Sequence, residues 1–181
     1  MADNIISLSD FEIIFADVIE GILGLTQDKV RISYSEDGQP FTKINENVCY
    51  LKVSEEQDDT NIYKQRKRKY DSETEQLTIS QSSMRVLSLR VVFYGPACDV
   101  LAAKLKDYFY FESSDEFLYK NNLSLIPNKT RITSKIYEEI NSRFWERVDL
   151  MMYFYNSITL TQGIGTIKSA NIIIKTDMEV D

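Results

Sequence analysis

The sequence predicts an α+β domain, with an antiparallel or mixed β-sheet and helices packed on one face. The periodic segments run in the order helix, two strands, a polar stretch, a strand, two helices and three strands. This order differs from the strand–helix alternation of a parallel sheet. The chain has 181 residues, of which 43% are hydrophobic and 27% charged, which is typical of one globular domain. We therefore expect residues 1–181 to form a single compact domain with a long polar loop at about 55–75.

The first predicted helix begins at Ser9, three residues before Glu12, which is the spacing of a capping box. Apolar residues follow at helical spacing; they are Phe11, Ile14, Phe15, Val18, Ile22 and Leu25. Gly24 suits the C-terminal end of this helix, because glycine readily takes a left-handed conformation.

Three strands are predicted in the first half of the chain, at 30–34, 48–53 and 84–94. The first is followed by a turn signal at 36–40. In the second, Cys49, Leu51 and Val53 share one face, as the period of two requires. The third has the strongest alternation, and its apolar face contains Leu87, Leu89, Val91 and Phe93.

A polar stretch at 55–75 contains the only dense charge feature of the sequence. Its basic residues are Lys64, Arg66, Lys67, Arg68 and Lys69. We expect an exposed loop or the tip of an extended hairpin, which is uncommon in a compact domain unless it has a function. Two interpretations remain open: a solvated loop tip, or a contact arm for an acidic neighbouring subunit or for DNA inside a ring. Aromatic residues for base stacking are sparse here, so DNA contact would be limited to the phosphate backbone.

Two helices are predicted after Gly95-Pro96, which ends the third strand. The buried stripe of the first is Cys98, Leu101, Ala102, Leu105, Tyr108 and Phe109. The second is short, is predicted to begin with a capping box of Ser113 and Glu116, and ends near residues 121–122.

The last third of the chain predicts three more strands, of which the first, at 123–132, is broken at Pro127 and suits a sheet edge. A long alternating strand follows at 145–155, then a turn at Gly163 and Gly165, and a last strand at 168–175. We expect the acidic tail at 176–181 to be frayed.

A second candidate interface lies at the start of that long strand, where Arg143, Trp145 and Arg147 alternate with other residues. Arginine and tryptophan are common anchors of protein interfaces. The alternative is a strand edge with a core-facing indole ring, and both interpretations remain open.

The residues for common catalytic chemistry are missing from the sequence, so we predict no enzyme, no catalytic residue, no cofactor and no metal site. The chain has no histidine, which excludes Ser-His-Asp and Cys-His nucleophile systems. The glycines at 163–169 lack Walker A spacing. The paired carboxylates at 58–59 and 138–139 are typical of solvated surface. Cys49 and Cys98 lie far apart among apolar neighbours and are predicted to be buried free thiols.

A net charge of −7 argues against a protein that holds nucleic acid by neutralising phosphates. It fits a surface that DNA slides past, although solubility explains it equally well. The sequence shows no signal-like segment and no apolar run long enough for a membrane span. We therefore expect action in a cytoplasm, or in a particle assembled in one, with no membrane partner.

Three stretches together resemble the phage neck terminator family, whose members are related in role to tail terminator (tail completion) proteins. They are Val91 to Ala97, with the letters VVFYGPA; Phe117-Leu118 with Asn122 to Ile126; and Arg143 to Val148, with the letters RFWERV. The resemblance covers most of residues 48–175. Asn122 stands where that family tends to have glycine, and asparagine also tolerates a left-handed turn. The polar stretch at 55–75 has no residue-by-residue counterpart.

This resemblance implies a virion structural protein that forms a ring, expected to be a homohexamer, at the neck or tail end of a particle. The ring would cap the tail tube protein and join it to the head–tail connector and neck proteins, with DNA passing through the hole. In a contractile or phage-like particle the same subunit would act as a collar beside the sheath. The alternatives are a tail-assembly chaperone or protein-binding module outside the virion, and an enzyme of another type.

Overall fold

The structure is a computed structural model, and it describes residues 5–32, 43–59, 64–73, 76–140 and 142–165. The α-helices are α1 (Leu8–Leu23), α2 (Cys98–Tyr110) and α3 (Asp115–Lys120), and the 3-10 helices are η1 (Gln27–Lys29), η3 (Glu112–Ser114) and η4 (Pro127–Lys129). The strands are β1 (Val30–Ile32), β2 (Val48–Glu56), β3 (Lys64–Asp71), β4 (Gln76–Tyr94), β5 (Leu123–Leu125), β6 (Arg131–Ile132), β7 (Ile136–Ile140) and β8 (Arg143–Gly165). Only β1 and β2 pair in parallel within this eight-stranded sheet, so the predicted mixed α+β fold is confirmed.

Two long strands run the whole length of the molecule. All 19 residues of β4 pair antiparallel with β8, from Gln76 opposite Gly165 to Tyr94 opposite Arg147. At about 3.3 Å per residue this ribbon is about 60 Å long, whereas ordinary strands span about 17–20 Å. Its neighbours are interrupted: β2 and then β3 pair along the free side of β4, and β5, β6 and β7 pair along the free side of β8. The ribbon is therefore the only continuous feature of the described sheet.

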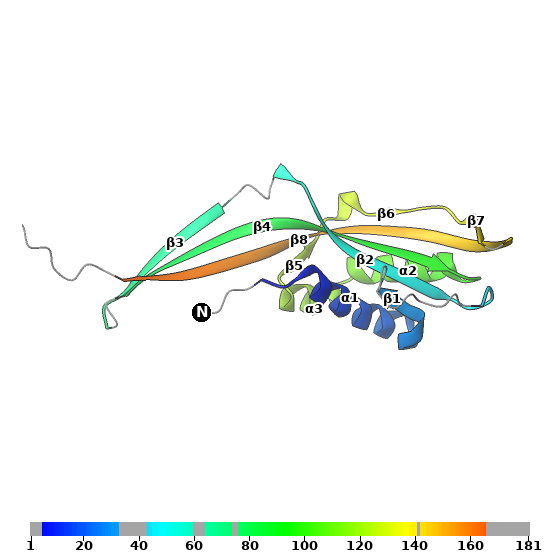
Figure 1. Ribbon diagram of the computed structural model, residues 1–181, viewed down its shortest axis with the longest axis horizontal. Coiled ribbons are helices and arrows are strands. Elements are labelled where there is room, and N and C mark those ends of the chain that lie inside the picture. The colour runs from blue at the N-terminus through cyan, green and yellow to red at the C-terminus, as the bar shows by residue number, and fades with distance from the viewer. Residues whose placement is uncertain (1–4, 33–42, 60–63, 74–75, 141, 166–181) are drawn as a thin grey trace, which may run out of the picture.

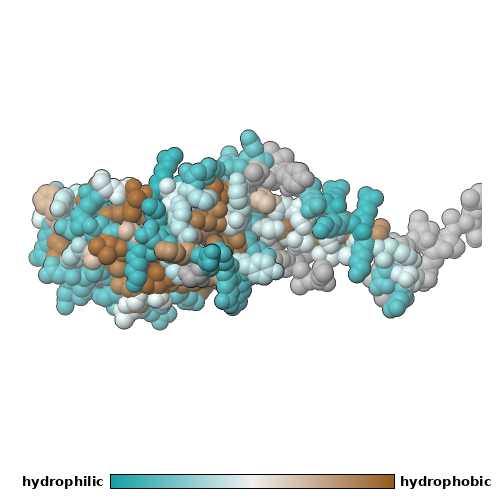
Figure 2. All heavy atoms as spheres, turned by 180° about the vertical axis from the view of Figure 1, so that it is seen from behind, coloured by the Kyte–Doolittle hydropathy of each residue, from teal (hydrophilic) through white to brown (hydrophobic). Residues whose placement is uncertain are grey.

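The molecule has a thick end and a thin end (Figure 1). At the thick end, the body, the three α-helices lie on one face of the sheet. At the thin end, the arm, only β3, residues 76–84 of β4 and residues 157–165 of β8 pair with one another. Figure 2 shows the same division from behind, with hydrophobic residues gathered over the body and mostly hydrophilic ones over the arm.

The core fills the space between the helices and the body half of the ribbon. Alternate residues of β4 and β8 face the helices and are fully or almost fully buried; they are Leu87, Leu89, Val91, Phe93, Val148, Leu150, Met152 and Phe154. Phe15 of α1 lies at the centre, with its ring centroid 5.3 Å from that of Phe154 and 6.2 Å from that of Phe109 in α2. The apolar stripes of α1 and α2, which follow the helical period, thus pack on the apolar face of β4 and β8, which follows the strand period of two.

The start of α1 differs from the prediction. Its N-cap is Ser7, whose Oγ accepts a hydrogen bond from the N–H of Asp10 at 3.1 Å. Glu12 is buried instead and accepts a hydrogen bond from the N–H of Val53 in β2 at 3.2 Å. The predicted capping box is wrong because Glu12 lies on the face of the helix that packs on the sheet. Gly24 ends the helix with φ 67°, as predicted.

The short helix α3 begins one residue later than predicted. Its N-cap is Ser114, and the Oγ of Ser114 donates back to the carbonyl of Phe111 at 2.9 Å, so it does not cap the helix. The predicted end near residues 121–122 is confirmed. Asn122 takes the left-handed conformation, with φ 54°, and its carbonyl accepts from Asn156 Nδ2 at 3.1 Å.

The strands of the ribbon are longer than the sequence indicates. The predicted strands at 84–94 and 145–155 are only parts of β4 and β8, because both continue through polar residues that carry little hydrophobic signal. The predicted turn at Gly163 and Gly165 is wrong, since Gly163 pairs with Thr78 inside β8 and Gly165 pairs with Gln76.

Within 55–75, the hairpin interpretation is correct for β3, which pairs with β4. The predicted turn at 36–40, the strand at 168–175 and the tail at 176–181 lie outside the described residues.

A buried arginine separates the body from the arm. Arg85 of β4 pairs in register with Asn156 of β8 on the helix-covered face, and only 9% of it is exposed. Its Nε donates to Asn156 Oδ1 at 2.9 Å, and its Nη2 donates to the carbonyl of Ile6 at 2.7 Å. Glu55 lies 3.4 Å from Nη1. Burial of this charge is tolerable because its donors are satisfied, and the apolar core ends at this residue.

We expect replacement of Arg85 by Met to lower the free energy of unfolding by about 3 kcal/mol, because it leaves buried polar partners unsatisfied. Arg90→Met is the matched control on the same strand, because Arg90 is half exposed and its partner Asp149 keeps Arg147. The control should cost less than about 1 kcal/mol. Urea unfolding of both variants measures the difference, and equal losses would contradict this account of Arg85.

Candidate assembly interfaces

The basic residues predicted as an interface all lie on β3, at the edge of the arm. Among the described strands β3 pairs only with β4, and all eight of its residues are exposed. Because side chains alternate along a strand, the basic run divides between two faces. Lys64, Arg66 and Arg68 lie on one face, whereas Lys67 and Lys69 lie on the other. Charges on an edge strand also discourage unwanted pairing with other strands.

One face of the arm, the apolar arm face, carries the hydrophobic residues. It consists of Tyr70, Leu77, Ile79, Ile158, Leu160 and Ile164. Tyr70, Leu160 and Ile164 are exposed, and the other three are half-buried. The unbroken β4–β8 register makes it the continuation, past Arg85, of the sheet face that the helices cover in the body. Lys64, Arg66 and Arg68 border it, and Arg66 Nε donates to Gln81 Oε1 on this face at 3.0 Å.

The opposite face of the arm is lined with hydroxyl groups. Ser82 Oγ lies 3.1 Å from Thr159 Oγ1, and Ser80 Oγ lies 3.5 Å from Thr161 Oγ1, in each case between paired residues. Such cross-strand hydroxyl pairs stabilise a sheet that has no hydrophobic layer on that side. The arm therefore has one apolar face with a basic border and one polar face.

The second predicted interface lies at the far end of the ribbon, and the structure does not bring it together with β3 (Figure 1). Trp145 is 7% exposed, and its ring lies edge-on to that of Tyr94 at 6.4 Å. The ring is thus buried within the subunit, but it lies on the sheet face opposite the helices and outside the core cluster, so it does not face the core. Arg143 is exposed.

Arg147 is held within the subunit by an ionic network on the sheet face opposite the helices. It donates to Asp149 at 2.7 and 2.8 Å and to Glu138 at 3.0 Å. These hydrogen bonds raise the pKa of the guanidinium. Burial opposes ionisation of Asp149, but hydrogen bonds from Arg147 and Arg90 hold its pKa below the usual value. Burial and the Tyr94–Glu138 hydrogen bond of 2.6 Å raise the pKa of Tyr94. Arg147 therefore serves the fold of the subunit.

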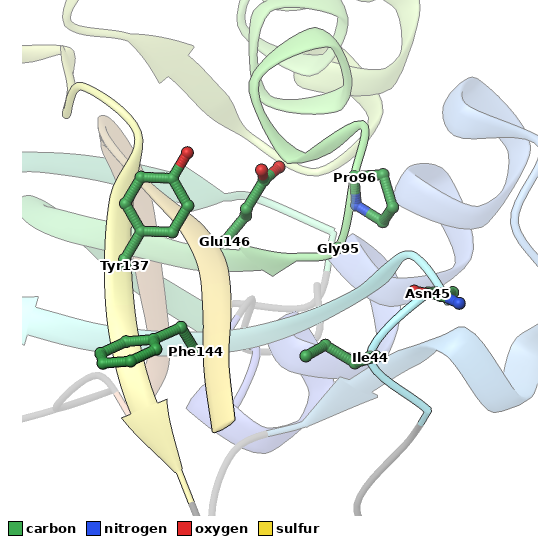
Figure 3. A pocket seen from close by; sticks show the side chains of 7 residues that line it. All are labelled: Ile44, Asn45, Gly95, Pro96, Tyr137, Phe144 and Glu146. Carbon is green, nitrogen blue, oxygen red and sulfur yellow. The ribbon is translucent and has the colours of Figure 1, made fainter. Parts of the chain in front are cut away.

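The exposed residues at this end are ones that the sequence did not single out. Tyr137 of β7 is 66% exposed and Phe144 of β8 is 65% exposed. Figure 3 shows both beside a pocket whose other lining residues include Pro96, at the start of α2, and Ile44. Strand alternation could not have identified them, because an exposed aromatic residue at a hairpin end has the same pattern as a buried one.

This pocket, of about 230 Å³, is smaller than the roughly 300–1,000 Å³ of typical small-molecule sites. Its acidic lining residue, Glu146, is paired with Lys135 at 2.9 Å. Within the described part of the chain no cluster of three or more metal-ligating side chains occurs. Cys49 and Cys98 are buried and free, as predicted, and burial raises the pKa of the Cys49 thiol to about 12.

The backbone at Gly95 shapes the pocket wall. Gly95 has φ 110°, a conformation that suits glycine, and its N–H donates to the carbonyl of Glu146 at 3.1 Å. A Cβ there would lie 2.6 Å from the carbonyl oxygen of Glu46. Asn47 Oδ1 accepts from the N–H of Ala97 at 3.0 Å beside it, which fixes the start of α2.

The family model described as phage neck terminator protein matches residues 9–178. No curated protein matches the chain. None of the described helices is both long enough and apolar enough to cross a membrane.

We expect Gly95→Ala to lower the free energy of unfolding by about 2 kcal/mol or more, because the new Cβ meets backbone and the conformation is strained. Gly21→Ala is the control, since Gly21 is exposed in the last turn of α1 and its Cβ would meet nothing within 4 Å. The control should gain about 0.5–1 kcal/mol. Thermal unfolding of both variants tests this, and a neutral Gly95→Ala would contradict the assigned backbone.

Proposed function

The chain belongs to the phage neck terminator protein family, and we propose that it is the ring-forming subunit that caps the tail tube and joins it to the head–tail connector. The family is one of virion structural proteins of the neck and tail region. In the proposed ring, expected to have six subunits, DNA passes through the central hole. In a particle with a contractile tail, the ring also meets the sheath as a collar.

The arm is the observation that carries this proposal. At about 3.3 Å per residue, the arm half of the ribbon extends about 30 Å beyond Arg85. Its apolar face carries six large hydrophobic or aromatic side chains beyond the end of the core cluster. An exposed apolar surface on a soluble protein commonly marks an interface. An arm of this length reaches a neighbouring subunit without distortion of the body.

Charge distribution favours contacts between copies of the chain. β3 carries five basic residues and one acidic residue, a net charge of +4. The whole chain has a net charge of −7, so all other residues together carry −11. A head-to-tail contact that closes into a ring needs two different complementary surfaces on one subunit. A basic arm and an acidic remainder of the chain meet that requirement.

The same distribution suits a channel for DNA. An acidic subunit surface repels phosphate and lets the duplex move, whereas a basic channel would bind it. In the proposed ring, the basic residues of β3 pair with acidic residues of neighbouring subunits and so are not available to bind DNA. Arg143, at the opposite end of the ribbon, remains exposed, and Trp145 and Arg147 hold the strand that carries it.

We expect reversal of the charges at Arg66, Lys67 and Arg68 to abolish assembly, because acidic neighbours would then repel the arm. The triple Glu variant, supplied to particles that lack the protein, should leave heads and tails unjoined in electron micrographs. The variant should keep the unfolding temperature of the parent, since all three side chains are exposed. A normal yield of joined particles would contradict the proposal that the arm makes the contact between subunits of the ring.

The neck position has its own test. Antibody labelling of purified particles should place the protein at the head–tail junction. A protein present in infected cells but missing from purified particles would favour an assembly chaperone.

A further inference from the structure

Residues 107–119 form a corner of the body that combines acidic and aromatic side chains. This segment covers the end of α2, η3 and most of α3 and contains four carboxylates, with Lys106 and Lys120 directly outside it. Phe111 is 67% exposed and Tyr119 is 87% exposed. Asp115 and Glu116 precede Tyr119 by four and three residues, so all three lie on one face of α3. We name Phe111, Glu112, Asp115, Glu116 and Tyr119 the acidic corner.

The fold of the subunit explains the carboxylates of the acidic corner but not its exposed rings, because Glu112, Asp115 and Glu116 lie in the first turns of η3 and α3, where negative charge is favourable. Its two exposed rings lie outside the core, although α3 also contributes Leu118 and Phe117 to that core. Exposed aromatic rings among carboxylates are typical of interface anchors rather than of ordinary surface. The corner therefore suits a partner that is both apolar and basic.

We propose that the apolar arm face of one subunit docks on the acidic corner of the next subunit in the ring. The two surfaces match in both respects. The arm offers exposed Tyr70, Leu160 and Ile164 to the aromatic rings, and it offers Arg66 and Arg68 on the same face to the carboxylates. The neighbour's α3 corner would cover the arm as α1 and α2 cover the same sheet face in the body. This inference rests on the proposed ring function.

Two other surfaces fit the arm less well. The outer side of α1 carries Asp10, Asp17 and Glu20, but within this helix Ile13 is the only large hydrophobic residue that is exposed. The far end of the ribbon carries Tyr137 and Phe144, with the exposed Glu139 opposite Phe144, but Glu138 and Glu146 there are already paired with Arg147 and Lys135. The acidic corner provides both components.

The two faces of β3 allow a matched test. Arg66→Glu with Arg68→Glu reverses two charges on the apolar arm face, and Lys67→Glu with Lys69→Glu makes the same change on the hydroxyl-lined face. Supplied to particles that lack the protein, the first variant should lower the yield of joined particles at least about tenfold. The second should stay within about threefold of the parent chain. Asp115→Lys with Glu116→Lys, combined with the first variant, should restore the yield.

The results separate this inference from the function on which it rests. If the Lys67 and Lys69 variant blocks assembly and the Arg66 and Arg68 variant does not, the docking face is wrong while the ring role stands. If Asp115→Lys with Glu116→Lys fails to restore assembly, the proposed docking contact is likewise wrong while the ring role stands. If the protein is absent from particles, both proposals fall.

Disulfide trapping tests the contact directly in assembled particles. The native thiols, Cys49 and Cys98, are fully buried and leave a clean background. A chain with Leu160→Cys and Tyr119→Cys should form covalent multimers on oxidation, seen as a ladder in a non-reducing gel. The control has Thr161→Cys with Tyr119→Cys, which moves the arm thiol to the opposite face. A ladder from the control and none from the Leu160 chain would overturn the proposal.

Discussion

The continuous pairing of β4 with β8 is the constraint on which the rest of the structure depends. Antiparallel strands in unbroken register keep each side chain on one face, so a single alternation extends from the core to the tip of the arm. The interrupted outer strands, β2 with β3 and β5 to β7, take their positions from this ribbon. A register shift of one residue would expose Leu89 and Val91 and bury Arg90, which lies between them on the other face. The core and the arm are therefore specified together.

The ribbon passes from an apolar environment to water at Arg85 and Asn156. On the body side of this pair, helices cover the sheet face, and the buried rings around Phe15 fill the space. On the arm side the same face keeps its alternation with fewer and more exposed apolar residues. The opposite face changes to hydroxyl pairs. One strand pair thus provides stability at one end and the proposed surface for assembly at the other.

The sequence predicted the fold wherever hydrophobic periodicity was strong. The apolar face of β4, the stripe of α2, the stop at Gly24 and the edge strand broken at Pro127 are all found in the structure. The prediction from sequence failed where tertiary contacts override the local preference of a residue. Glu12 and Ser114 bond to backbone outside the predicted caps, and Gly163 lies within a strand because pairing to β4 overrides its turn preference.

The candidate interfaces were predictable only in part. The basic run on β3 is visible in the sequence because its charge density is unusual, although its division between two faces depends on strand register. Trp145 and Arg147 looked like interface residues, but packing against Tyr94 and ion pairs with Asp149 occupy them. Phe111, Tyr119, Tyr137 and Phe144 gave no signal, because periodicity does not distinguish an exposed ring from a buried one.

The central claim is that this chain is built to assemble with copies of itself through its arm. The measurement that tests it most directly is the mass of the purified protein across a range of concentrations, with electron microscopy of negatively stained samples and with isolated tails added as a template. The account predicts closed rings with a central hole, either free at high concentration or at tail ends. A protein that stays monomeric at every concentration, and that binds no tail end, would contradict it.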